Sequence, residues 1–142
     1  MIEEGETIPD FKVLNQTGEK ISSESIEDAV IYFYPKADTP GCTREACNFR
    51  DSISELEGLE MEVLGVSTDS VEDQKSFHEK NGLNFDLLAD EDGEVSEKLG
   101  VLNDSGVAER TTFLVKNGEV VKIFRKVDPE THVEEVVQYL KN

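Results

Sequence analysis

VIYFYPKADTPGCTREACNFRD, residues 30–51, contains both cysteines of the chain. The apolar run at its start, Val30–Tyr34, is too short for a typical helix and is rich in β-branched and aromatic residues, which predicts a buried strand. Pro35 ends this strand, and Asp38–Gly41 then supplies a polar N-cap candidate, a proline for the first turn and a flexible glycine. The stretch therefore predicts a strand followed by a helix that begins just before Cys42.

The predicted helix places Cys42 in its first turn. At roughly 100° per residue, Cys42 lies on one core-facing stripe with Ala46, Phe49, Ile53 and Leu56. The unpaired N–H groups and the positive end of the helix dipole favour the thiolate form of a cysteine at this position. Two interpretations follow from the residues alone: the cysteine is a reactive thiolate, or it is one more small buried hydrophobic residue, the common fate of a free cysteine.

Cys47 lies further along the same predicted helix. It is about 140° around the helix from Cys42 and about 8.7 Å away between Cα atoms. A disulfide tolerates no more than about 7 Å between Cα atoms. A bond between the two cysteines would therefore require the start of the helix to unwind. A zinc site is not indicated, because the two histidines, His78 and His132, lie far away in the sequence and form no ligand pattern with the cysteines.

The same residues carry a resemblance to a known family. Pro35-x3-Thr39-x2-Cys42 resembles the active-site signature of peroxiredoxins, P-x3-[T/S]-x2-C. The longer string YPKADTPGCTREACNFRD is similar to the Q-type branch, also called bacterioferritin comigratory proteins, in which the resolving cysteine sits five residues after the peroxidatic one. Cys47 occupies that position, and the resemblance extends over about residues 8–140.

The resemblance implies a thiol-dependent peroxidase that reduces hydrogen peroxide and organic hydroperoxides. Cys42 would be the attacking thiolate and Cys47 the resolving cysteine, and a thioredoxin-like donor would reduce the disulfide between them. Thr39 would donate its hydroxyl to the peroxide, and Pro35 would shield the thiolate from bulk water. Arg110 stands before a predicted strand, where the family has an arginine that favours the thiolate and holds peroxide oxygen. No metal, haem or flavin is implied.

Glu45 falls in the same family motif, one turn beyond Cys42. It would orient an arginine there, although an ordinary acidic residue at a helix start explains it almost as simply. Arg44 and Arg50 are alternative partners for its carboxylate, and the sequence leaves this choice open.

Two other functions remain open on the sequence. A thiol–disulfide oxidoreductase acting on protein disulfides would share the fold, but the C-x-x-C spacing that such proteins use is absent from the chain. A non-catalytic binding or chaperone-like protein of the same fold would not depend on its thiols. An unchanged function after Cys42→Ser would favour that second alternative.

The remaining elements alternate strands with helices. Met61–Ser67 predicts a second buried strand, parallel to the first because a helix intervenes. Thr111–Val115 and Val120–Phe124, joined by Asn117-Gly118, form the clearest predicted hairpin. Further expected elements are an opening strand within Ile8–Leu14, a turn over 15–18, a helix capped by Ser70 that runs to about Asn81, a strand over Phe85–Ala89, and a turn at Asp90–Gly93 leading to a short helix that ends near Gly100.

The last helix is predicted from an apolar stripe within Val133–Leu140. Asp128-Pro129 would supply its cap and first position, and His132, near its start, is expected to face solvent. Strands that alternate with helices and then form a hairpin predict a mixed central sheet flanked by helices, an α/β arrangement. The resemblance identifies it as a thioredoxin-like fold. The sequence has no internal repeat or linker, so residues 1–142 are expected to form a single domain.

Acidic residues outnumber basic residues by 32 to 14, which gives a net charge of −18. Nucleic acid and anionic membrane surfaces are poor partners for such a chain. The simple interpretation is a solvated surface that keeps the protein soluble. A sharper hypothesis is adaptation to high salt, in which screening relieves the repulsion between like charges. Q-type relatives are often monomeric, and a monomer suits so charged a surface.

Targeting signals are not apparent in the sequence. No apolar run approaches 18 residues and the N-terminus is acidic, so neither a membrane span nor a secretory signal is predicted. Two cysteines without an export signal indicate a reducing cytoplasm, where thiols are more often catalytic than structural.

Overall fold

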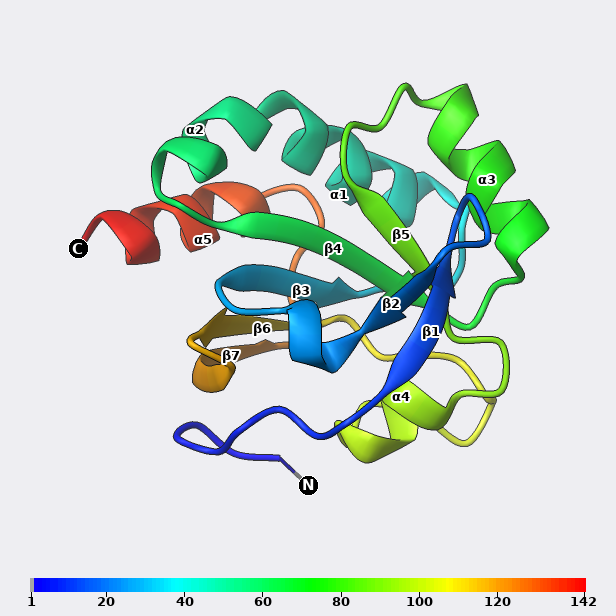
Figure 1. The fold of residues 1–142 in the computed structure, drawn as a ribbon. Coiled ribbons are helices and arrows are strands. Elements are labelled where there is room, and N and C mark those ends of the chain that lie inside the picture. Colours follow the sequence, from blue (N-terminus) through cyan, green and yellow to red (C-terminus); the bar gives the residue numbers. More distant parts are fainter. Residues whose placement is uncertain (1) are drawn as a thin grey trace.

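The computed structural model describes residues 2–142, which form a mixed sheet with helices on both faces (Figure 1). The strands are β1 (Lys12–Asn15), β2 (Lys20–Ser22), β3 (Ala29–Phe33), β4 (Glu62–Ser67), β5 (Asp86–Ala89), β6 (Thr111–Lys116) and β7 (Glu119–Arg125). The helices are α1 (Pro40–Asp51), α2 (Ile53–Gly58), α3 (Val71–Lys80), α4 (Glu94–Lys98) and α5 (His132–Lys141), with a short 3-10 helix η1 (Ser23–Ser25) before β3. Across the sheet the strand order is β2-β1-β5-β4-β3-β6-β7.

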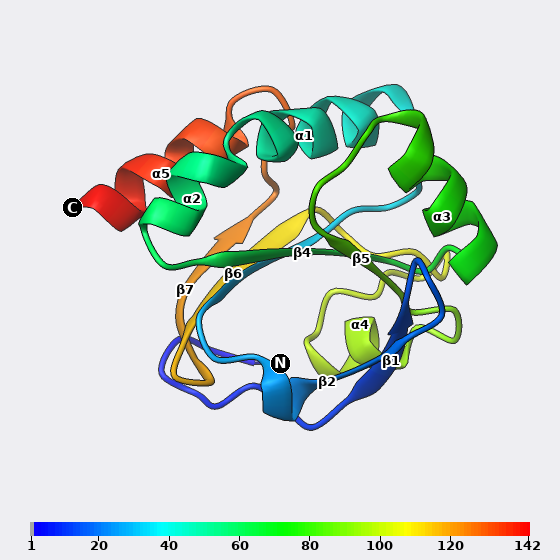
Figure 2. The same cartoon turned by 45° about the horizontal axis from the view of Figure 1, so that its top comes forward.

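Strand β3 lies inside the sheet, as its apolar sequence predicts. It pairs in parallel with β4 and antiparallel with β6, and all of its residues are buried. Because both faces of the sheet are covered, both sets of alternating side chains must be apolar. Val30 and Tyr32 pack into the cluster that includes Phe49 of α1, whereas Ile31 and Phe33 pack into the opposite cluster with α4. Figure 2 shows α1, α2, α3 and α5 on one side of the sheet and α4 on the other.

The loop after β3 carries the chain into α1. Thr39 is the N-cap and the following proline is the first helical residue, which confirms the predicted helix start. Two contacts hold this loop, one to α3 and one to the segment after β4. The Tyr34 hydroxyl donates to Gln74 of α3, and the Ala37 N–H donates to the Asp69 carboxylate at 2.7 Å. The loop is therefore held at Tyr34 and at Ala37 before α1 begins.

The other predicted elements are confirmed with small changes in their bounds. β4 runs parallel to β3, and the Ser70 hydroxyl accepts from the Asp73 N–H at the start of α3. The hairpin between β6 and β7 turns at Asn117 and Gly118, whose φ angles of 53° and 75° are the left-handed values that a tight hairpin turn requires. Within residues 2–142, no helix is both long and apolar enough to cross a membrane.

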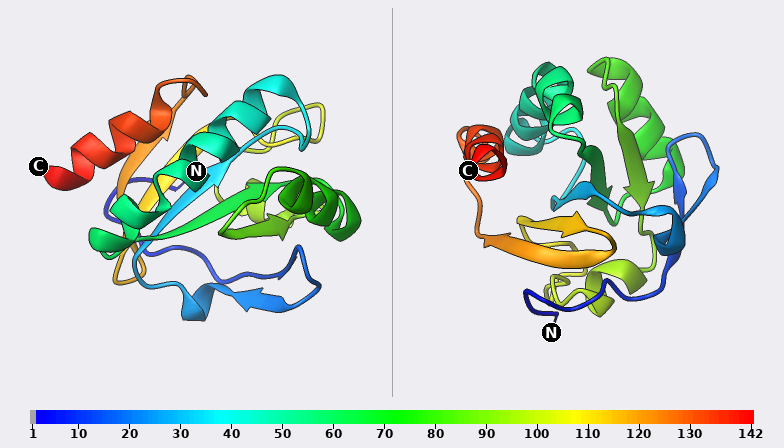
Figure 3. Two further views of the ribbon diagram at one scale, coloured as in Figure 1. Left: turned by 90° about the horizontal axis from the view of Figure 1, so that it is seen from above. Right: turned by 60° about the vertical axis from the view of Figure 1, so that its left-hand side comes forward.

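The start of the last helix was predicted wrongly. Asp128 and Pro129 form a separate turn, in which the Asp128 carboxylate accepts from the Glu130 N–H at 2.9 Å. α5 begins at His132, with Thr131 as its N-cap. From there α5 runs beside α1 (Figure 3).

His132 is buried, with 1% of its surface exposed, so the expectation that it faces solvent was also wrong. Its Nε2 lies 2.7 Å from the Thr112 hydroxyl, and its Nδ1 lies 3.1 Å from a Glu135 carboxylate oxygen. Burial lowers the pKa of His132, although Glu135 opposes this shift. Both ring nitrogens have partners, and this pairing allows a polar side chain to lie in the core.

Candidate active site

Cys42 lies in the first turn of α1 and is 1% exposed. The first hydrogen bond into the helix runs from the Thr43 N–H to the Thr39 carbonyl, at 2.9 Å. The N–H groups of Gly41 and Cys42 therefore belong to the amides that an α-helix leaves without a helical partner. They form the positive end of the helix dipole, so the sulfur lies where a negative charge is favoured. Cys42 and Cys47 are both free thiols.

Arg110 brings a positive charge to this sulfur from another part of the chain. It stands directly before β6, the antiparallel neighbour of β3, and its side chain is 21% exposed. Its Nη2 donates to the Cys42 sulfur at 3.1 Å, and its Nη1 donates to a Glu45 carboxylate oxygen at 3.0 Å. The structure thus brings together the predicted arginine, the predicted nucleophile and the motif glutamate.

The open question of which arginine pairs with Glu45 is settled by this contact. Arg44, which is exposed, instead lies 3.8 Å from Glu130, and Arg50, which is half-buried, pairs with Asp51 at 2.9 Å. Among the described residues, Arg110 is therefore the arginine that pairs with the buried carboxylate.

Glu45 is an unusual acidic residue because its side chain is fully buried, with 0% exposed. Burial raises the pKa of Glu45 from 4.5 to about 7, although the neighbouring Arg110 charge pulls it down. Its second oxygen, Oε2, is without a hydrogen-bond partner among the described residues. Raising the pH through about 7 therefore favours the ionised Glu45 and its ion pair with Arg110.

Gly41 has a packing role that the sequence reasoning missed. A Cβ atom at this position would lie 2.8 Å from Arg110 Nη2, which is closer than real Cβ contacts allow. A larger residue here would force the Arg110 guanidinium, which contacts the Cys42 sulfur, to shift. Its place in the motif was visible, but the sequence could explain it only as a flexible residue at the helix start.

Thr39 and Pro35 both lie on the loop between β3 and α1. The Thr39 hydroxyl donates to the Lys36 carbonyl at 2.8 Å rather than capping the helix. Pro35 lies two residues after the end of β3 and is half-buried. Their predicted roles toward a peroxide stay predictions, and Thr39 would have to turn from Lys36 to perform its role.

Cys47 lies on another side of α1 and has different neighbours. It is half-buried, and its sulfur lies 3.8 Å from the side-chain oxygen of Asn81, which follows α3. Asn81 was missed, because in the sequence it reads only as part of a helix end before Gly82. No local signal identifies a contact between residues so far apart in the chain.

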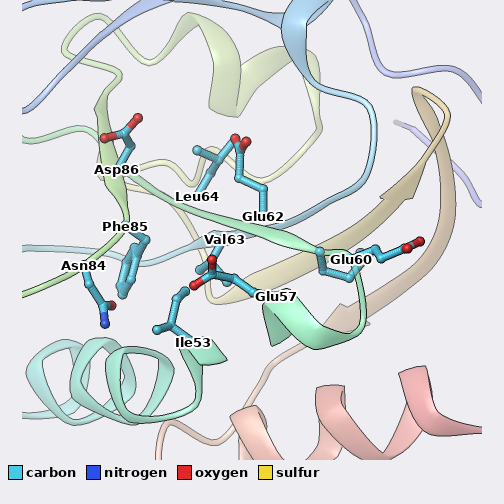
Figure 4. A pocket seen from close by; sticks show the side chains of 10 residues that line it. Ile53, Glu57, Glu60, Glu62, Val63, Leu64, Asn84, Phe85 and Asp86 are labelled. Atoms are coloured by element: carbon cyan, nitrogen blue, oxygen red, sulfur yellow. The ribbon is translucent and has the colours of Figure 1, made fainter. Parts of the chain in front are cut away.

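A pocket lies away from Cys42, Cys47 and their neighbours. It has a volume of about 500 Å³ and lies between α2 and the beginnings of β4 and β5 (Figure 4). Cys42, by contrast, follows the C-terminal end of β3, so the two places are at opposite ends of the parallel strands. The pocket is lined by Ile53, Glu57, Glu60, Met61, Glu62, Val63, Leu64, Asn84, Phe85 and Asp86.

Comparisons with known proteins agree with the fold and the motif. The sequence profile of the AhpC/TSA family matches residues 5–123. Peroxiredoxin Bcp of Bacillus subtilis is 40% identical over 151 residues, which cover 99% of this chain and 96% of the relative.

Solved structures show the same fold. Peroxidoxin BcpB from Mycobacterium tuberculosis superposes with a TM-score of 0.91 at 32% identity, covering 99% of this chain and 97% of the other. The bacterioferritin comigratory protein of Xanthomonas campestris, studied for its alkyl peroxide reduction activity, gives 0.87 at 33% identity, covering 92% and 90%. The predicted thioredoxin-like fold is confirmed. The chain therefore belongs to the AhpC/TSA family and, within it, to the Bcp or Q-type peroxiredoxins, which are thiol peroxidases.

Proposed function

We propose that Cys42 is the peroxidatic residue of this enzyme and that the enzyme reduces both hydrogen peroxide and organic hydroperoxides. The observation that carries the proposal is the 3.1 Å contact between Arg110 Nη2 and the Cys42 sulfur at the start of α1. A guanidinium and free helix amides both favour the thiolate, which is the nucleophilic form. The alkyl peroxide activity named for the Xanthomonas campestris relative supports the organic substrates.

In the first step the Cys42 sulfur attacks one peroxide oxygen. The S–O bond forms as the O–O bond breaks, so the sulfur is oxidised to sulfenic acid and the other oxygen leaves as water or an alcohol after taking up a proton. Arg110 remains charged and presents donors to the sulfur and to the oxygens on which charge develops. Thr39 donates its hydroxyl to the peroxide, and Pro35 shields the sulfur from water.

In the second step the Cys47 sulfur attacks the sulfenic sulfur of Cys42. The S–S bond forms, the S–O bond breaks, and hydroxide leaves as water after taking up the proton released by Cys47. Both cysteines lie in α1, and helical geometry separates their Cα atoms by about 8.7 Å, so the first turns of α1 must open. Exchange with a thioredoxin-like donor then restores both thiols, and residues 1–142 act together as one catalytic domain.

The test is a single-turnover experiment. Reduced protein is mixed with one equivalent of hydrogen peroxide, quenched from milliseconds to seconds, and analysed by mass spectrometry. We expect rapid sulfenic acid at Cys42 and then a Cys42–Cys47 disulfide. Oxidation no faster than that of a free thiol would contradict the proposal.

Cys47→Ser separates the two steps. The first oxidation of Cys42 should keep its rate, because Arg110 and the helix start are untouched. Turnover with a thioredoxin donor should be lost, and excess peroxide should convert Cys42 to sulfinic acid. Turnover of Cys47→Ser at the wild-type rate would refute the resolving role of Cys47.

We further propose that the protein works as a monomer in a reducing, salt-rich cytoplasm. A net charge of −18 on 142 residues supports this, because salt screens the repulsion between like charges. The expected result is a melting temperature that rises as potassium chloride is increased from dilute buffer to molar concentrations. A melting temperature that does not respond to salt would count against the proposal.

A further inference from the structure

The C-terminal end of α3 contacts the active-site segment on both sides of the reactive cysteine. Lys80 Nζ lies 2.9 Å from an Asp38 carboxylate oxygen in the loop before α1. The next residue, Asn81, contacts α1 itself. Its carbonyl accepts from Arg50 Nη1 at 2.7 Å, and its side-chain oxygen lies 3.8 Å from the Cys47 sulfur.

These contacts differ in what happens to them when the helix opens. Arg50 lies in the last turn of α1, where Asn84 Nδ2 also donates to its carbonyl oxygen at 3.3 Å. Figure 4 shows the Asn84 side chain directed toward the helix. The contacts at Arg50 therefore anchor the end of α1 that can stay wound. The contact between Cys47 and Asn81 must break before the two cysteines can meet.

The orientation of the Asn81 amide determines which form of Cys47 it stabilises. Asn81 Nδ2 donates to the Phe77 carbonyl at 3.0 Å, so the amide oxygen is the atom that faces the Cys47 sulfur. An amide oxygen only accepts hydrogen bonds. The sulfur must then be the donor, which means that this contact stabilises the thiol and disfavours the nucleophilic thiolate.

We propose that Asn81 is a positioning residue for Cys47, holding it as a thiol against α3 until Cys42 has been oxidised. The inference rests on the proposed roles of the two cysteines. Release from Asn81 lets Cys47 give up its proton and attack the sulfenic sulfur, with water as the product. Asn81 thereby sets how long the sulfenic acid persists, and so how readily a second peroxide oxidises it to sulfinic acid.

Two substitutions of Asn81 test this proposal because they should act in opposite directions. Asn81→Ala removes the acceptor, so the disulfide should form about fivefold faster, the equivalent of one hydrogen bond of about 1 kcal/mol. Asn81→Asp keeps an acceptor and adds a negative charge that repels the thiolate, so the disulfide should form several-fold more slowly. Both variants lose the bond to Phe77, and a merely structural role would therefore shift both rates in the same direction.

The measurement is the quenched mass-spectrometric time course after one equivalent of hydrogen peroxide, with sulfinic acid counted after a tenfold excess. Asn81→Ala should accumulate less sulfinic acid than wild type, and Asn81→Asp more. A second readout is alkylation of Cys47 by iodoacetamide in the Cys42→Ser background, which should be faster with Asn81→Ala. This second readout also requires no peroxide chemistry.

Asn48→Ala is the matched control. Asn48 neighbours Cys47 on α1, but its amide donates to the carbonyls of Pro129 and Glu130 on the opposite side of the helix. Its loss should leave the alkylation of Cys47 unchanged. Rates of disulfide formation that shift together in the Asn81 variants, or do not shift, would overturn the inference. Failure of wild type to form sulfenic acid at Cys42 would instead overturn the proposed function.

Discussion

Cys42 and Cys47 share one helix, yet they have different surroundings. Cys42 is buried and touches the charged side chain of Arg110, which is itself paired with a buried carboxylate. Cys47 is half-buried and touches the neutral amide of Asn81. The difference lies in what each side of the helix meets. Cys42 meets Arg110, directly before β6, and Cys47 meets Asn81, directly after α3. Two identical thiols can therefore have different tasks without any difference in their own chemistry.

The largest expected effect comes from removing the charge at Cys42. Arg110→Gln should slow the first oxidation by about 10²–10³-fold, because a preorganised donor to the reacting atoms is lost. Stopped-flow peroxide consumption under single-turnover conditions measures this rate. Arg110→Gln also leaves Glu45 buried without its cation, so Arg110→Gln/Glu45→Gln is the control, and it should regain stability while the rate remains low. Oxidation of Arg110→Gln at the wild-type rate would contradict the role of Arg110.

A smaller effect is expected when Arg110 is kept but displaced. Gly41→Ala puts a Cβ atom 2.8 Å from Arg110 Nη2, so the guanidinium must move. The first oxidation should slow by about 10-fold to 100-fold, since a misplacement of about 1 Å is enough for a loss of that size. Gly58→Ala in α2 is the matched control, because a Cβ there has nothing within 4 Å. Equal rates for the two alanine variants would show that the close approach at Gly41 does not matter.

The smallest expected effect concerns Glu45, the carboxyl group paired with Arg110, and how its titration changes the stability of the fold with pH. The pKa of Glu45 is about 7 in the folded protein and 4.5 ordinarily, so between these values the folded state holds a proton that the unfolded state has lost. This contribution to stability is present below pH 4.5 and is lost as the pH rises through about 7, by an amount on the order of 3 kcal/mol. Glu45→Gln has no such proton, so its free energy of unfolding should fall less than that of wild type between pH 5 and pH 8.

Urea unfolding of both proteins at the two pH values measures this difference. Every other titrating group is shared, so the comparison isolates Glu45. Parallel loss of stability in wild type and Glu45→Gln would mean that Glu45 is ionised throughout this range.

Local patterns were enough to predict most of the fold and, within the site, the helix start that carries Cys42. The apolar run of β3, the proline and cap before α1, and the Asn117-Gly118 turn each leave a signal within a few residues of sequence. The position of Arg110 came from the family resemblance, whereas Glu45 was left open between a partner of an arginine and an ordinary acidic residue at a helix start. The structure then supplied which arginine it was.

The errors and omissions have a common physical cause, which is contact between distant segments. His132 looked polar and therefore exposed, but Thr112 and Glu135 satisfy its two nitrogens and allow burial. Asn81 meets Cys47 from 34 residues away, and the crowding at Gly41 depends on the guanidinium of Arg110, directly before β6. Such contacts depend on tertiary packing, so no local sequence signal could reveal them.

Because β3 lies between β4 and β6, it differs from the start of α1 in how it unfolds: β3 requires global unfolding, whereas the first turns of α1 can unwind locally. Residues of β3 are buried and paired on both sides, so we expect their amide protons to exchange with solvent only through unfolding of the whole domain. The first turns of α1 open locally in every proposed catalytic cycle. Catalysis would thus involve repeated melting of one rim of the molecule, while the centre that aligns this rim stays folded from one turnover to the next.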